Sequence, residues 1–225
     1  MLFDGLTNFV SDPSPSLPQP TVQPSAPPTR FGAIRITLPP DPAKSVISIF
    51  ERPNDTNTHD YVVYITQYLR AEGTYYAELL TLLNTAPPSA RIEIYIGSPG
   101  GSLHTGAMIA SAIQTSKATV TTVSMGVVAS ASALIWSYGH NRIAAPGSVL
   151  MFHMSSHGDW DNSKAIAIRA ENTVRYVKEV AIDPLVEQGV LTAEEAETIV
   201  DRRRDLWLDA ETVNARLEAV RAKIV

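Results

Sequence analysis

The sequence contains no cysteine, and this absence excludes several kinds of chemistry. Disulfide bridges, thiolate nucleophiles and thiolate metal ligands all depend on cysteine, so none of them can occur in these 225 residues. Disulfides are also the usual indicator of an oxidising compartment. The cysteine count therefore gives no information about the redox compartment in which the protein works.

Long apolar runs and basic residues are also scarce. The longest weakly polar run, Val127 to Trp136, is too short to cross a bilayer, and Met1 to Val10 lacks both the basic residue and the apolar core of a secretory signal. The formal net charge is −5, and Arg202 to Arg204 is the main basic cluster. We therefore expect a soluble, cytoplasmic protein that binds neither nucleic acid nor membrane.

Composition divides the chain into three segments. Residues 1–30 form a proline-rich tail, because seven prolines between positions 11 and 30 favour extended, solvated backbone. Residues 31–60 alternate in hydrophobicity on both sides of a turn at Pro39 to Pro42, which predicts an N-terminal hairpin and a polar loop. Residues 61–225 form the main domain.

Strand-like and helix-like patterns alternate in the first half of the main domain. Strands are expected at 61–66, 91–96 and 119–124, with helices at 74–83, 103–114 and within 125–136. This alternation is typical of repeated βαβ units, in which parallel strands are joined by right-handed crossovers. The sequence therefore predicts an α/β fold.

The second half contains a helix of unusual length. A short strand at 149–152 precedes a helix of roughly 25 residues from Asn162 to Gln188, which exceeds what one small domain needs. We therefore expect part of this helix to pack on another subunit. Thr192 and Glu195 form a capping box for the next helix, and a short extended piece at 205–208 precedes the last one.

A glycine-rich loop, Gly97 to Ser102, follows the second strand. The adjacent Gly100 and Gly101 let backbone N–H groups approach a ligand, and the following helix adds its positive end. The Lys-Ser/Thr of a phosphate loop is missing and the glycine spacing does not fit a dinucleotide site. An acyl oxyanion is the remaining small anion, and a simple tight turn is the alternative.

Two hydroxyls, Ser130 and Ser132, lie on the small, apolar run from Met125 to Trp136. A serine at a helix start, after a buried strand, lies where N–H groups are unpaired and developing negative charge is favoured. One of the two is therefore a candidate nucleophile. The alternative is a buried helix whose serines bond back to carbonyls.

His153 is the best candidate for a base, because it ends a buried strand where an imidazole is costly unless it is used. Its orienting acid could be Asp201, Asp205 or Asp209, and periodicity does not choose among them. A zinc site of His153 with His157 and either Asp159 or Asp161 is a weaker alternative, because no helical zinc motif surrounds them.

Four motifs together resemble the proteolytic subunit of Clp protease, the ClpP family of serine peptidases. In order and spacing they are Tyr95 to Gly101, Gly126 to Ser130, Leu150 to His153 and Arg204 to Ala210. The resemblance implies a ClpP/crotonase-like α/β fold with a protruding handle helix. It further implies Ser130 as nucleophile, His153 as base, Asp205 as orienting acid, and the N–H groups of Gly100 and Ala131 as the oxyanion hole.

The resemblance also implies a function and an assembly. We expect a serine endopeptidase that hydrolyses polypeptides without cofactor or metal, inside a chamber made of two interlocked heptameric rings. Docking of an AAA+ unfoldase is disfavoured, because the proline-rich tail and hairpin replace the family's usual N-terminal region. Gly-Val-Val-Ala-Ser in place of Gly-Gln-Ala-Ala-Ser, a shortened loop at Gly139 to Arg142 and a different C-terminal ending indicate a divergent, specialised bacterial or viral member.

Three alternatives remain at this point. A specialised processing protease would act without an unfoldase. An acyl-CoA enzyme of the crotonase fold would need catalytic carboxylates near the glycine loop, and a structural ring protein would keep the fold without the reaction. The ordered Ser130, His153 and Asp205 count against the last two.

Overall fold

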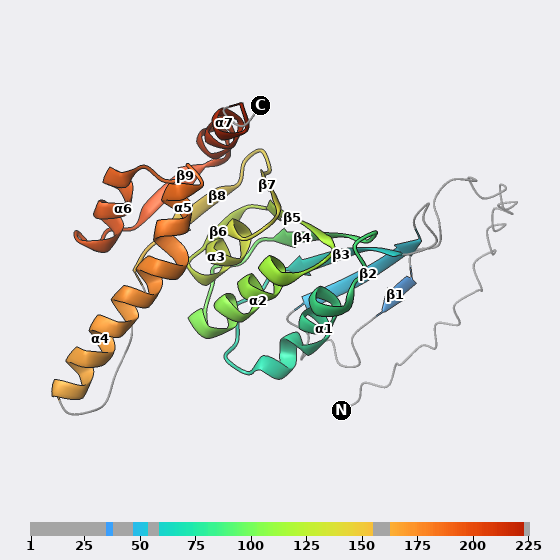
Figure 1. Ribbon diagram of the computed structural model, residues 1–225, viewed down its shortest axis with the longest axis horizontal. Coiled ribbons are helices and arrows are strands. Elements are labelled where there is room, and N and C mark those ends of the chain that lie inside the picture. Colours follow the sequence, from blue (N-terminus) through green and yellow to red (C-terminus); the bar gives the residue numbers. More distant parts are fainter. Residues whose placement is uncertain (1–34, 38–46, 54–58, 155–162, 223–225) are drawn as a thin grey trace, which may run out of the picture. The chain divides into compact units, whose positions relative to one another are not determined.

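The computed structural model describes residues 35–37, 47–53, 59–154 and 163–222 (Figure 1). The proline-rich tail, the predicted turn at Pro39 to Pro42 and the loop with His157, Asp159 and Asp161 lie outside the described residues. The strands are β1 (Arg35–Thr37), β2 (Ile47–Pro53), β3 (His59–Ile65), β4 (Arg91–Ile96), β5 (Thr119–Ser124), β6 (Val127–Ala129), β7 (Asn141–Ala144), β8 (Val149–Phe152) and β9 (Leu206–Asp209). The helices are η1 (Gly73–Tyr76), α1 (Ala77–Thr85), α2 (Leu103–Thr115), α3 (Ala131–Ser137), α4 (Ser163–Val177), η2 (Lys178–Ile182), α5 (Asp183–Glu187), α6 (Ala193–Val200) and α7 (Ala210–Arg221).

The larger sheet has six strands in the order β1-β2-β3-β4-β5-β7. Strands β3, β4, β5 and β7 run parallel, which confirms the predicted α/β fold, and β1 pairs antiparallel with β2 as the hairpin pattern predicted. Strand β2 also pairs along its whole length with β3, from Ile47 opposite Ile65 to Pro53 opposite His59. The described strands of the 31–60 segment therefore continue the sheet of the main domain.

The core lies between this sheet and helices α1 and α2, which pack side by side on one face of it (Figure 1). Ile92, Ile94 and Ile96 alternate along β4 and are completely buried, as are Leu79 of α1 and Ile109 of α2. Period-two burial on the strand and helical spacing above it are what the sequence pattern predicted. This core fixes β4, and hence the glycine loop that follows it.

A second sheet has three strands in the order β6-β8-β9, and the candidate catalytic residues lie at the ends of these strands. Strands β6 and β8 are parallel, and β8 and β9 are antiparallel. The run from Met125 to Trp136, within which a helix was expected, begins with a strand, because the β-branched Val127 and Val128 pair with Val149 and Leu150. Helix α3 begins only at Ala131, so Ser130 lies at the strand-to-helix turn.

The predicted long helix is present and contains an irregular turn. Helix α4, the π-helical turn η2 and α5 follow one another without a break from Ser163 to Glu187. A π-turn leaves backbone carbonyls poorly satisfied, and the Tyr138 hydroxyl donates to one of them, Val180 O, at 2.7 Å. Val177 and Ile182 are buried in the main core, which anchors this end of the segment.

Candidate active site

Ser130 lies on a strained turn between β6 and α3. Its φ of 59° and ψ of −126° belong to a region that non-glycine residues rarely adopt. Its N–H donates to Met151 O at 2.9 Å, which ties the turn to the neighbouring strand β8. A serine held in this way presents its hydroxyl at the tip of the turn, as the strand-turn-helix nucleophile elbow of α/β hydrolases does.

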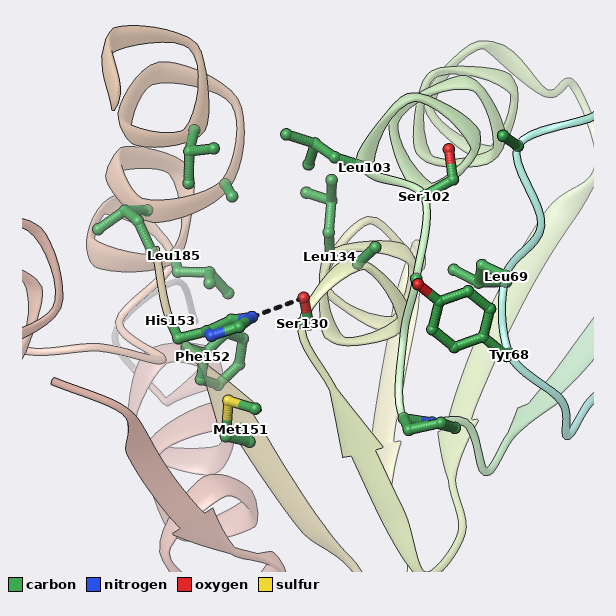
Figure 2. A pocket seen from close by; sticks show the side chains of 17 residues that line it. Tyr68, Leu69, Ser102, Leu103, Ser130, Leu134, Met151, Phe152, His153 and Leu185 are labelled. Carbon is green, nitrogen blue, oxygen red and sulfur yellow. Dashed lines mark hydrogen bonds between the residues drawn. The ribbon is translucent and has the colours of Figure 1, made fainter. Parts of the chain in front are cut away.

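His153 directly follows β8, the strand parallel to β6. Because Ala129 is opposite Met151, the carboxyl ends of the two strands meet, and the side chains just beyond them face each other. The His153 Nε2 lies 2.8 Å from the Ser130 Oγ, a hydrogen-bond distance (Figure 2). The pair is therefore arranged as a hydroxyl and the base that could take its proton.

Asp205 reaches the histidine from the third strand of the same sheet. Leu206, the first residue of β9, is opposite Phe152, so Asp205 lies beside His153. The Asp205 Oδ1 is 3.6 Å from the His153 Nδ1, which is an ion-pair distance and longer than a hydrogen bond. The Asp205 side chain is 55% exposed, whereas that of His153 is 24% exposed.

The other two candidate acids have different surroundings. Asp209 accepts a hydrogen bond from the Thr212 N–H at 2.8 Å and caps α7, and this hydrogen bond, with that of the Thr212 side chain, lowers the pKa of Asp209. Asp201 ends α6 and lines a separate cavity with Lys178. Among the three aspartates, the structure brings Asp205 to the histidine.

The glycine loop lies against the Ser130 turn. Gly100 has a φ of +94°, and a Cβ at this position would lie 2.5 Å from Ala129 O and 2.9 Å from the Ser130 Cβ. Only glycine fits such a close approach. The Gly100 N–H, which we expected to face a ligand, donates instead to the Ser98 Oγ at 3.1 Å. Ala131, as the first residue of α3, has no helical acceptor for its own N–H.

Ser132, the second candidate hydroxyl, is completely buried. Its Oγ lies 2.6 Å from Ser98 O and 2.7 Å from Ala129 O, and accepts from the Ala129 N–H at 3.0 Å. The Ser132 hydroxyl is therefore engaged in hydrogen bonds to the backbone, whereas Ser130 faces an open cavity. The side-chain positions separate two serines that the sequence pattern alone left equivalent.

An apolar cavity of about 520 Å³ opens beside Ser130 and His153 (Figure 2). Its apolar wall comes from four parts of the chain, represented by Leu69, Leu103, Phe152 and Leu185. No Asp or Glu is found among the described residues that line it, which disfavours the crotonase-type alternative. This wall could not be predicted from the sequence, because α5 and the glycine loop are brought together only by the fold.

Among the residues that the structure describes, neither a metal-binding cluster nor a membrane-spanning helix is found. Within ranges 35–37, 47–53, 59–154 and 163–222, no cluster of three or more His, Asp or Glu side chains could hold a metal ion. Likewise, no helix in the described part of the chain is long and apolar enough to span a membrane. His140 has a backbone role instead, because its Nδ1 accepts from the Val120 N–H at 3.0 Å.

A serine at a strand-to-helix turn, with its hydroxyl 2.8 Å from a histidine nitrogen, is an arrangement typical of serine-type hydrolases. A family model, Clp protease, matches residues 58–216, which is more than half of the chain. The chain therefore belongs to the Clp protease family, a family of serine-type peptidases, and the predicted family and fold class are confirmed.

Curated relatives agree with this assignment. The ATP-dependent Clp protease proteolytic subunit 2 of Rhodococcus jostii is 34% identical over 134 residues, covering 59% of this chain and 67% of the relative. Subunit 3 of Streptomyces coelicolor is 32% identical over 138 residues, covering 59% and 60%, respectively. Subunit 1 of Frankia casuarinae is 34% identical over 134 residues, covering 59% and 62%. The match thus spans about two thirds of these relatives' lengths.

Proposed function

We propose that this protein is a serine endopeptidase in which Ser130 is the nucleophile, His153 the general base and Asp205 the residue that orients the imidazole. The observation that carries the proposal is the distance of 2.8 Å between the Ser130 Oγ and the His153 Nε2 beside an apolar cavity. Membership of the Clp protease family supports the same reaction class.

The reaction follows from this geometry. As the Ser130 Oγ attacks the peptide carbonyl carbon, its proton passes to the His153 Nε2, and the carbonyl electron pair moves onto the oxygen. When the tetrahedral intermediate collapses, the C–N bond breaks and His153 gives its proton to the leaving amine. Water then attacks the acyl ester with His153 again as base, which releases the acid and restores the Ser130 hydroxyl.

The oxyanion would be held by the N–H groups of Ala131 and Gly100. Ala131 starts a helix and has a free donor by position, whereas the Gly100 N–H must leave or share its 3.1 Å bond with the Ser98 hydroxyl. Catalytic hydrogen bonds are often looser before the substrate binds and tighten in the transition state. The two donors would then converge on the same oxygen.

Substrate preference follows from the cavity. Its wall of leucine, phenylalanine, valine and isoleucine side chains lies directly beside the nucleophile, so an apolar side chain next to the cleaved bond would fill it. We therefore expect cleavage after large apolar residues of extended or unfolded polypeptides. Peptides with acidic residues at that position would be poor substrates, because burial of an unpaired charge is costly.

We also propose the family's ring assembly. Val177 anchors the end of α4 in the core, whereas Glu171, Arg175 and Tyr176 on the same helix are exposed, which fits a surface that meets another subunit. The curated relatives are named as subunits of an ATP-dependent protease, and two stacked heptameric rings would enclose the sites. Light scattering that detects only a monomer would contradict this assembly. Cytoplasmic location and activity without an unfoldase stay predictions of the sequence.

The decisive experiment is labelling with a fluorophosphonate probe, which reacts with activated serines. We expect the native chain to be labelled on the peptide that contains Ser130, and Ser130→Ala to show no label. Ser137→Ala is the matched control, because Ser137 lies buried in the same helix and its hydroxyl donates to Leu134 O. An unlabelled native protein, or equal labelling of Ser130→Ala on that peptide, would show that the nucleophile is assigned wrongly.

A further inference from the structure

Ser132 joins two segments that are distant in sequence. Its hydroxyl lies closest to Ser98 O, at 2.6 Å, and this carbonyl belongs to the glycine loop. The Ser132 Oγ also accepts a hydrogen bond from the Ala129 N–H at 3.0 Å, and Ala129 lies on the turn that carries Ser130. With one proton, the hydroxyl donates to one carbonyl at a time, and Ser98 O and Ala129 O both lie within hydrogen-bond distance.

Ordinary helix chemistry accounts for only part of this arrangement. A serine inside a helix usually bonds back to a carbonyl of the preceding turn. Ser137, in the same helix, does so through Leu134 O at 2.7 Å. Ser132 has the same kind of carbonyl in Ala129 O at 2.7 Å, but its hydroxyl also lies 2.6 Å from Ser98 O, 34 residues away, to which the Ala129 N–H donates at 3.0 Å. The two bonds clip the glycine loop onto the nucleophile turn.

The clip lies between the two proposed oxyanion donors. Ser98 is two residues before Gly100, and Ser132 directly follows Ala131. The Gly100 Cα already lies so close to the turn that an added Cβ would be 3.1 Å from the Ala131 nitrogen. Oxyanion donors act over a narrow range of about 2.7 to 3.1 Å, so a small shift of the loop would weaken them.

We propose that Ser132 is a positioning residue of the peptidase reaction, whose hydroxyl fixes the separation between the Gly100 and Ala131 N–H groups. The inference rests on the proposed function, since it takes Ser130 as the nucleophile and these two N–H groups as the oxyanion hole. Ser132 itself is buried and touches no substrate. It acts through the backbone of the glycine loop.

The test is Ser132→Ala in the full chain, measured with a fluorogenic peptide that carries an apolar residue before the cleaved bond. We expect kcat to fall about 10- to 100-fold, less than for direct loss of a donor, with KM and the pH midpoint of kcat/KM unchanged. Fluorophosphonate labelling should be slower in proportion, yet reach the native endpoint of one label per chain. A loss of folded sites would lower this endpoint instead.

Two further variants make the test specific. Ser137→Ala should keep native kcat, because its hydroxyl serves only the helix. Ser132→Cys fills a similar volume with a weaker donor, so its kcat should lie between native and Ser132→Ala. Native kcat in Ser132→Ala, or a kcat loss matched by a lower labelling endpoint in both Ser132 variants, would overturn the proposal. Failure of the proposed function is a separate result, namely persistent labelling of Ser130→Ala.

Discussion

The two sides of His153 are built very differently. On one side, Ser130 is held by a backbone bond to Met151 O, the contact of Gly100 and the buried hydroxyl of Ser132, and its Oγ lies 2.8 Å from the imidazole. On the other side, Asp205 is 55% exposed and 3.6 Å from the imidazole. Ser130 is fixed by the packed interior, whereas Asp205 lies at the surface.

This difference indicates which parts of the site a single chain holds in place before substrate binds. Backbone bonds inside the protein are short and shielded from water, so they hold the hydroxyl and the oxyanion donors rigidly. An exposed carboxylate is screened by solvent and contributes little to orientation. We therefore expect substitutions on the Ser130 side to cost more activity than substitutions on the Asp205 side.

The largest effect should come from His153→Ala, which removes the proposed base. We expect kcat for a fluorogenic peptide to fall on the order of 10⁴-fold, as when other serine triads lose a member. His104→Ala, at an exposed position at the start of α2, should keep native kcat. If His153→Ala retained near-native turnover, the catalytic pair would have to be sought elsewhere.

Gly100→Ala tests the packed side of the site without removing a reacting group. The added Cβ would lie 2.5 Å from Ala129 O, so the loop must shift, and kcat should fall about 10²- to 10³-fold. Gly147→Ala is the matched control, because Gly147 also has a positive φ, +79°, but nothing within 4 Å of an added Cβ. Equal activity losses in the two variants would trace the effect to backbone strain alone.

Asp205→Asn tests the exposed side. Because the carboxylate is solvent-exposed and beyond hydrogen-bond distance, we expect kcat to fall about 10- to 100-fold, well below the effect of losing a buried triad acid. Asp209→Asn should leave kcat unchanged, since asparagine also caps helices well. A fall in kcat as large as that of His153→Ala would mean that the assembled protein holds Asp205 as firmly as Ser130. The two sides of His153 would then not differ in how firmly they are held.

The smallest effect on activity should come from Glu195→Gln, which lies away from the site. Burial raises the pKa of Glu195, but hydrogen bonds from Arg216 and from the Thr192 backbone outweigh it, so the pKa is lowered. The charged pair joins α6 and α7 through contacts of 2.7 and 2.9 Å. Glu195→Gln should keep native kcat and lower the free energy of unfolding by about 1 to 3 kcal/mol at neutral pH.

The pH dependence of that difference has a definite direction. A carboxyl whose pKa is lowered in the folded state stabilises the fold above its ordinary pKa of about 4.3, and this stabilisation is lost as pH falls through the lower folded-state value. Denaturant unfolding should therefore show native protein and Glu195→Gln converging below about pH 4. Glu197→Gln, which breaks an exposed pair with Arg202, should differ little from native protein at any pH.

Much of the fold could be predicted because its strands and helices have clear periods. Ile92, Ile94 and Ile96 alternate as a half-buried strand must, and the capping box of Thr192 and Glu195 is formed as expected. Strand β6 escaped prediction because three residues are too few to show a period. Its identity as a strand depends on pairing with β8, which only the folded chain supplies.

The candidate site was predictable in its residue types and less so in its geometry. The order of the motifs singled out Ser130 and His153, and the structure places their side chains in hydrogen-bond contact. The Ser98 hydroxyl that occupies the Gly100 N–H, and the cavity wall from α5, depend on contacts between segments far apart in sequence. No local pattern carries such information, so these features had to come from the structure.

The parallel pairing of β6 with β8 has an evolutionary consequence. Since Ala129 is opposite Met151, Ser130 and His153 are brought together by the register of two short strands. Mutations that preserve this register can alter the surrounding residues freely while the pair stays in place. The 2.8 Å contact between the Ser130 Oγ and the His153 Nε2 thus depends on strand register more than on the identity of the neighbouring side chains.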